Sequence, residues 1–132
     1  MSIAVQDIGM SEYGEAWDYQ DELFKKIVDI KLANRNRDIE IERPGFFLFT
    51  EHKHVYTLGK SGDLSNLLLT EEQLRDKGIS FFKSNRGGDI TYHGPGQVVG
   101  YPIIDLESFR PDIRWYMRSL EEVIIRTIAE YG

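Results

Sequence analysis

The chain has 132 residues, of which 41% are apolar and 29% charged, with a formal net charge of −6 and no cysteine. This composition is typical of one globular domain over residues 1–132, and it excludes disulfides, thiolate metal sites and a cysteine nucleophile within the chain. The acidic balance argues against a nucleic-acid partner. No apolar run approaches the ~20 residues that cross a bilayer, and no signal peptide opens the chain, so we expect a cytoplasmic protein with no membrane partner.

The first half of the sequence predicts a long helix followed by two strands. Ser11 can cap a helix over residues 12–33. The apolar run 46–49 is typical of a buried strand, and residues 54–59 predict a second strand that ends at a turn. The helix is predicted from residues at three- and four-residue spacing that form one mostly apolar stripe, namely Tyr13, Trp17, Gln20, Phe24, Ile27 and Lys31.

The second half predicts a short helix, further strands and a last helix. Thr70 and Gln73 have the spacing of a capping box, which predicts a helix over residues 71–77. Residues 79–83 and 97–105 predict strands because they are rich in aromatic or β-branched side chains.

The last helix is predicted after residue 110, with Pro111 in its first turn. Its apolar stripe is Ile113, Met117, Leu120, Ile124 and Ile128. The order of helices and strands predicts an α/β (α+β) fold with one mixed sheet flanked by helices.

The most informative segment is RGGDITYHGPGQVVGYP, residues 86–102, which surrounds several polar side chains with five glycines. Turns alone explain the glycines but not their polar neighbours. Arg86 offers a planar donor fork, and His93 can donate or accept a proton near neutral pH. A ligand site is therefore expected here, although Asp89 could simply pair with Arg86.

Three other patterns are weaker. The Gly-Lys-Ser of residues 59–61 lacks the earlier glycine of a phosphate-binding loop, because His54 stands there. The glycines of residues 94–100 lack dinucleotide-binding spacing. His52 and His54 would share one face of a strand and could hold zinc with His93, but surface or pocket-edge histidines are the simpler interpretation.

The segment RGGDITYHGPGQVVGYPIIDL resembles the signature of the lipoate-protein ligase B family, the lipoyl(octanoyl) transferases. The resemblance extends to YGEAWDYQ, to HVYTLGKSGD and to RWYMRSLEEVIIRTIAEYG, and so covers nearly the whole chain. The residues that match the family signature are Arg86, Gly87, Gly88, Thr91, Tyr92, His93, Gly94, Pro95, Gly96, Gln97 and Tyr101.

The resemblance implies a fold similar to the catalytic domain of biotin and lipoate ligases. It also implies transfer of an octanoyl group from acyl carrier protein to a lysine of lipoyl domains, those of 2-oxoacid dehydrogenase complexes or the glycine cleavage H protein, without cofactor or metal. The residues implied to bind the acyl substrate are Arg86, Gly87, Gly88, Asp89, Ile90, Thr91, Tyr92 and His93. Those implied to shape the pocket are Gly94, Gly96, Gln97 and Tyr101.

The chain departs from the family at the catalytic residues. The family's cysteine and lysine lie C-terminal to the signature, whereas this chain holds no cysteine at all. The resemblance therefore implies the N-terminal part of a catalytic domain that is inactive alone. A truncated sheet would expose an edge and apolar surface, so self-association or a loosened last helix is expected.

Two other functions stay open at this point. One is an ATP-dependent ligase similar to lipoate or biotin ligases, which would need a nucleotide. The other is a non-catalytic module that binds acyl groups or lipoyl domains without turnover.

Overall fold

The computed structural model describes residues 2–36, 38–39 and 41–132. The chain contains both strands and helices, interspersed along the sequence, so the predicted mixed fold class is confirmed. In chain order, the elements are β1 (Ile3–Ser11), α1 (Tyr13–Asn34), β2 (Gly45–His52), β3 (Val55–Leu58), the 3-10 turn η1 (Leu64–Asn66), α2 (Glu71–Asp76), β4 (Ser80–Lys83), β5 (Ile90–His93), β6 (Val98–Ile103), the 3-10 turn η2 (Leu106–Ser108) and α3 (Ile113–Ala129).

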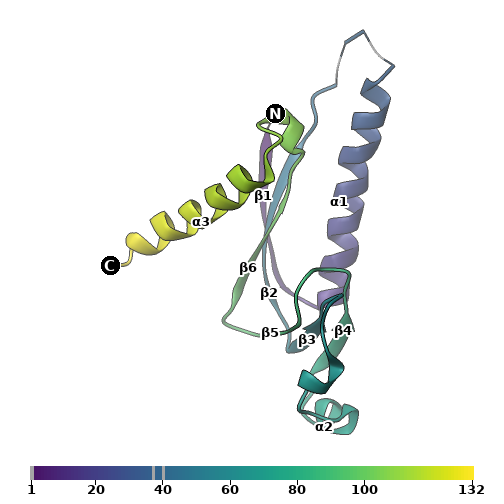
Figure 1. The fold of residues 1–132 in the computed structure, drawn as a ribbon, viewed down its shortest axis with the longest axis vertical. Coiled ribbons are helices and arrows are strands. Elements are labelled where there is room, and N and C mark those ends of the chain that lie inside the picture. Colours follow the sequence, from purple (N-terminus) through teal and green to yellow (C-terminus); the bar gives the residue numbers. More distant parts are fainter. Residues whose placement is uncertain (1, 37, 40) are drawn as a thin grey trace.

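The described strands form two three-stranded sheets rather than the one sheet predicted (Figure 1). The first has the order β1-β2-β6, with β2 parallel to β1 and antiparallel to β6. The second has the order β4-β3-β5, with β3 parallel to β4 and antiparallel to β5. The chain passes from one sheet to the other between His52 and Val55, so the two sheets meet where β2 ends.

Helix α1 packs along the first sheet and forms the core with β2. Leu23 and Ile27 are buried against Phe46 and Leu48, and Leu48 is fully inaccessible. The predicted apolar stripe is therefore only partly correct. Phe24 is 56% exposed, and the neighbouring Leu23 takes its place in the core.

Strand β1 was not predicted, and its last residue overturns the expected cap of α1. Ser11 ends β1, whereas the N-cap position belongs to Glu12, which makes no side-chain cap hydrogen bond. Ile3 and Val5 are exposed on this edge strand. The strand sequence IAVQDIGMS does not alternate regularly between apolar and polar residues, so it lacks the pattern that marks a half-buried strand. The Ser11 hydroxyl instead faces Thr50 and His52.

The capping box of α2 is confirmed, and it supports a stability prediction. The Thr70 hydroxyl accepts a hydrogen bond from the Gln73 N–H, and the Gln73 side chain accepts from the Thr70 N–H. We expect Thr70→Ala to lower the free energy of unfolding by about 1 kcal/mol, measured by urea denaturation. Thr127→Ala, within α3, is the control and should change stability little, so equal losses in both variants would contradict the capping role.

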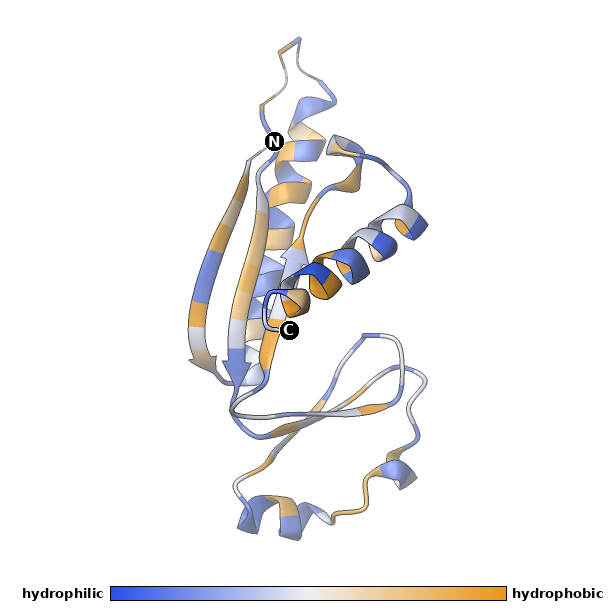
Figure 2. Ribbon diagram, turned by 90° about the vertical axis from the view of Figure 1, so that its left-hand side faces the viewer, coloured by the Kyte–Doolittle hydropathy of each residue, from blue (hydrophilic) through white to orange (hydrophobic). Residues whose placement is uncertain are grey.

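Helix α3 extends away from both sheets and keeps its apolar face open (Figures 1 and 2). It begins after Asp112, whose carboxylate accepts a hydrogen bond from the Trp115 N–H, so Pro111 precedes the cap instead of entering the first turn. No residue of α3 is buried. The self-association or loosened last helix expected from the sequence stays a prediction. Among the described helices, none is long and apolar enough to cross a membrane. The exposed apolar side chains are Ile113, Trp115, Met117, Val123, Ile124, Ile125 and Ile128.

Candidate functional site

Arg86 fixes the glycine-rich loop onto β3. Its guanidinium donates to the Thr57 hydroxyl and to the Thr57 carbonyl, at 2.8 Å for each from Nη2. It also donates to the carbonyls of Gly87 and Asp89, at 2.9 Å and 2.8 Å. Thr57 belongs to β3 and is fully buried, so the Arg86 guanidinium is anchored in the interior of the second sheet. In this structure the Arg86 fork holds the protein's own backbone.

Asp89 joins the same loop to the segment after β3. Its carboxylate accepts from the Asp63 N–H at 3.0 Å and from the Asn66 side-chain amide. The suggested pairing of Asp89 with Arg86 is therefore wrong for the carboxylate, because only the Asp89 carbonyl receives the guanidinium. A Cβ on Gly59 would collide with the carbonyls of Gly87 and Gly88, so this close approach requires glycine.

Strand β5 lies inside the glycine-rich segment, where no strand was predicted. It pairs with β3 so that His93 is opposite Val55 and Thr91 is opposite Thr57. His93 and Thr91 therefore share the face on which the Arg86 fork meets Thr57. Ile90 and Tyr92 project from the other face of the sheet.

Tyr92 belongs to a separate pair on that other face. Its ring stacks with His54 at a centroid distance of 6.1 Å, and its hydroxyl is hydrogen-bonded to His54 Nδ1. Gly94 lies against this hydroxyl, because a Cβ there would overlap it.

The His-Gly-Pro-Gly-Gln run forms a tight turn between β5 and β6. The Gln97 N–H donates to the Gly94 carbonyl at 3.1 Å, and Gly96 has a positive φ of 86°. Proline at the second position and a positive-φ glycine at the third are the preferences of a type II turn. The turn brings Gln97 back to His93, and a 2.6 Å hydrogen bond joins Gln97 Oε1 to His93 Nδ1.

A chain of hydroxyl and imidazole groups crosses the junction of the two sheets. Thr50 donates its single hydroxyl hydrogen to the Gly9 carbonyl at 2.7 Å. In the 2.9 Å hydrogen bond between the Ser11 and Thr50 hydroxyls, Ser11 must therefore be the donor. Ser11 can then only accept from His52 Nδ1, at 3.4 Å. His52 Nε2 is left to accept from the Tyr101 hydroxyl at 2.8 Å. The chain thus assigns neutral His52 with its proton on Nδ1.

The same junction gathers three further rings around His52. His93 lies edge-on to His52 at a centroid distance of 5.6 Å, and Tyr13 stacks almost parallel to His93 at 6.1 Å. The third of these rings is Phe82, whose centroid lies 5.0 Å from that of Tyr13. Burial, with the nearby His93 charge, lowers the pKa of His52, whereas burial raises the pKa of Tyr13 and of Tyr101. The neutral forms of His52, Tyr13 and Tyr101 are therefore favoured.

The structure does not support the zinc interpretation of the histidines. His52 ends β2 and is fully buried, whereas His54 precedes β3 and is exposed, so the two do not share one strand face. Within the described residues, no group of three or more histidine, aspartate and glutamate side chains is arranged to hold a metal ion.

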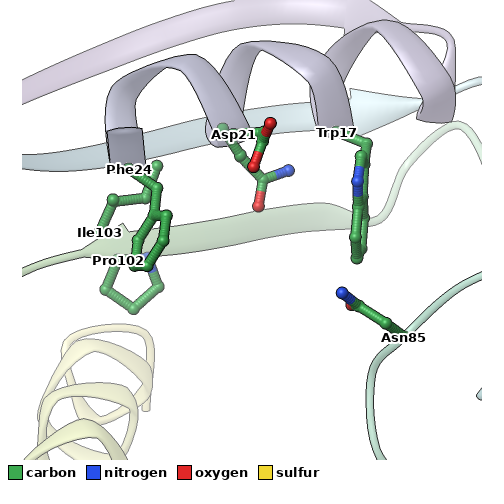
Figure 3. Close-up of a pocket in the computed structure, with 7 residues that line it drawn as sticks. Trp17, Asp21, Phe24, Asn85, Pro102 and Ile103 are labelled. Carbon is green, nitrogen blue, oxygen red and sulfur yellow. The ribbon is translucent and has the colours of Figure 1, made fainter. Parts of the chain in front are cut away.

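A shallow cavity of about 270 Å³ lies beside the ring cluster, because its lining residue Trp17 contacts the rings of Tyr13 and Phe82 (Figure 3). Phe24 of α1 lies over Pro102 of β6 at one end of the cavity, and Trp17 of α1 lies over Asn85 at the other end. None of the residues expected to bind or shape the acyl pocket lines this cavity. Asn85, however, directly precedes Arg86, so the cavity adjoins the glycine-rich loop.

The predicted site residues therefore divide into three groups. Arg86 to Asp89 form the loop held on β3. His93, Gln97 and Tyr101 lie at the sheet junction, and Tyr92 faces the opposite side with His54. Sequence reasoning missed the roles of Ser11, Tyr13, Thr50 and Thr57, because polar or aromatic residues in strands and helices carry no local signal of such contacts.

Comparison with known proteins now bears on this arrangement. The catalytic domain of lipoyl protein ligases A and B, as a family, matches residues 12–132 of the chain. The chain belongs to this family. Within the lipoyl protein ligase A/B family, the octanoyltransferase of Flavobacterium psychrophilum is 62% identical over 131 residues, and that of Flavobacterium johnsoniae is 60% identical over 130 residues.

These relatives are longer than the chain. The matches cover 99% and 98% of the chain but 56% of each relative, so the chain spans about half the length of the curated octanoyltransferases it matches. The crystal structure of P. falciparum LipL1 in complex with lipoate superimposes with a TM-score of 0.54 at 16% identity, over 80% of this chain and 32% of that one. That likeness confirms a lipoate-ligase-like fold for this family member.

Proposed function

We propose that the chain contributes the acyl-binding part of an octanoyltransferase, which moves an octanoyl group from acyl carrier protein to a lysine of lipoyl domains. The observation that carries this proposal is the 62% identity, over 99% of the chain, to a protein named octanoyltransferase. The likeness extends through the whole glycine-rich segment and the sheet junction. This transfer would be the first step of protein lipoylation.

The geometry supports a division of labour within the site. Arg86 and Thr57 would keep the loop of residues 86–89 against β3, which leaves the loop's backbone and Thr91 to meet the acyl thioester. His93 and Tyr101 would bound the pocket at the sheet junction. The chain has no cysteine, so the nucleophile that the family resemblance implies would have to come from outside these 132 residues.

The test is the intact mass of a lipoyl domain after incubation with octanoyl-acyl carrier protein. The full-length Flavobacterium psychrophilum enzyme is expected to add one octanoyl group, whereas the 132-residue chain alone is expected to add none and to bind octanoyl-acyl carrier protein in a pull-down. Addition by the chain alone would overturn the proposal that transfer needs a nucleophile from outside these 132 residues. Addition only with free octanoate and ATP would indicate a ligase, and no binding at all would reject the acyl-binding role.

A further inference from the structure

The starting point is the hydrogen bond between Gln97 and His93. The amide oxygen of Gln97 can only accept a hydrogen bond, and it lies 2.6 Å from Nδ1 of His93. Nδ1 must therefore carry the proton. In neutral His93 the other ring nitrogen, Nε2, then holds a lone pair.

The second ring nitrogen of His93 is accessible and has no protein partner. Nε2 makes no hydrogen bond to any residue in ranges 2–36, 38–39 and 41–132. Within the same ranges, every buried side-chain nitrogen or oxygen of a residue that is not exposed has a partner. Because His93 is half-buried, its Nε2 must reach solvent.

The neighbouring histidine cannot offer the same group. His52 is fully buried, and both of its nitrogens are engaged, one with Ser11 and one with Tyr101. Of the two imidazoles at the sheet junction, only His93 therefore has a lone pair that a bound molecule can meet. The rings that face His93 from α1 and β2 are Tyr13 and His52.

The turn makes the Gln97 side chain well placed to control this tautomer. Gly96 donates its N–H to Glu51 Oε2 at 2.7 Å, which fastens the turn to β2. The carboxylate of Glu51 is thereby occupied by backbone and serves to hold the turn. Gln97 then returns to the start of the turn, four residues after His93, with its oxygen on Nδ1.

We propose that Gln97 is a positioning residue that holds His93 in the Nδ1–H tautomer. Nε2 then accepts a hydrogen bond from the lysine amine of a lipoyl domain, which attacks the acyl thioester, forms the amide and releases the thiol. The identity of that amine rests on the proposed function, whereas the tautomer does not. A protonated Nε2 could only donate to the amine nitrogen and would occupy the lone pair that must attack, so the fixed tautomer determines whether the amine is held ready to react.

The tautomer can be measured directly in the 132-residue chain. Long-range ¹H–¹⁵N spectra distinguish a protonated from an unprotonated ring nitrogen for each of the three histidines. We expect neutral His93 to show a protonated Nδ1 and an unprotonated Nε2. In Gln97→Leu the Nδ1 partner is lost, and the Nε2–H form is expected to become the major tautomer, as it is for free imidazole side chains.

A conservative variant separates positioning from simple packing. Gln97→Glu keeps an acceptor on Nδ1, so the Nδ1–H tautomer should persist. His54→Gln assigns the spectra by removing one set of signals and should leave those of His93 unchanged. The His52 signals, which come from a buried ring, report whether each variant remains folded.

Two results would overturn this proposal. One is a protonated Nε2 on His93 in the unchanged chain, which would mean that the Gln97 amide nitrogen donates to Nδ1. The other is a Gln97→Leu variant that keeps the original tautomer while the His52 signals stay native. Neither result depends on whether the chain, or any longer protein, transfers octanoyl groups, so the proposed function is tested separately.

Discussion

Arg86→Ala is expected to lower the free energy of unfolding by about 3 kcal/mol, because it removes a charge-assisted hydrogen-bond network rather than a surface charge. The guanidinium bridges Thr57 to the carbonyls of Gly87 and Asp89. Without it, the fully buried Thr57 hydroxyl loses its donor, and the loop of residues 86–89 loses its attachment to β3. Urea denaturation followed by tyrosine and tryptophan fluorescence measures the change.

Two companion variants show what the arginine supplies. Arg86→Lys keeps the charge but not the planar fork, so most of the loss, about 2 kcal/mol, should remain. Arg118→Ala removes an arginine whose side chain is 79% exposed and, among the residues that the structure describes, is ion-paired only with Glu121 on α3, so it should have little effect. Full recovery of stability in Arg86→Lys would show that charge alone matters and would contradict the role of the fork.

The features predicted correctly from sequence are those whose causes are local. The capping box of Thr70 and Gln73 involves residues three apart, and it forms as expected. The tight turn of residues 94–97 could have been predicted in the same way, because its proline and glycine determine a turn type by their own φ angles. A strand such as β1, at a sheet edge with exposed apolar side chains, gives no such signal.

The features that sequence reasoning missed depend on contacts between distant residues. Arg86 was expected to face a ligand, but its main partner, Thr57, is 29 residues away and inside another strand. His52 was considered as a zinc ligand or as a surface or pocket-edge residue, and the fold buries it between Ser11 and Tyr101, so it is not at the surface. The glycine-rich segment could be singled out from the sequence because glycines crowded among polar residues are a local pattern, and its role in binding a substrate stays a prediction. Which of these residues support the loop and which remain available to a substrate depends on the pairing of β3 with β5.

Stability should depend on pH through His52, and the direction follows from its burial. Burial and the nearby His93 lower the pKa of His52 in the folded chain, whereas an unfolded histidine has a pKa of about 6.5. As the pH falls below about 6.5, the unfolded state therefore binds a proton that the folded state refuses, and the free energy of unfolding decreases toward the lower folded pKa. At higher pH both states are neutral at this position, and its contribution to pH dependence disappears.

The variant His52→Gln should separate this contribution from that of the carboxylates. At about pH 7.5 it should cost about 2 kcal/mol, because it breaks the chain from Tyr101 to Ser11, while the additional loss between pH 7.5 and about pH 5 should be smaller than in the unchanged chain. His54→Gln, at an exposed histidine, is the matched control and should retain the original pH dependence. Urea denaturation at the two pH values measures both the loss of stability at about pH 7.5 and the additional loss on acidification. If His52→Gln and His54→Gln lose stability in parallel on acidification, His52 is not the group that resists protonation, and the neutral hydrogen-bond chain assigned to the sheet junction is wrong.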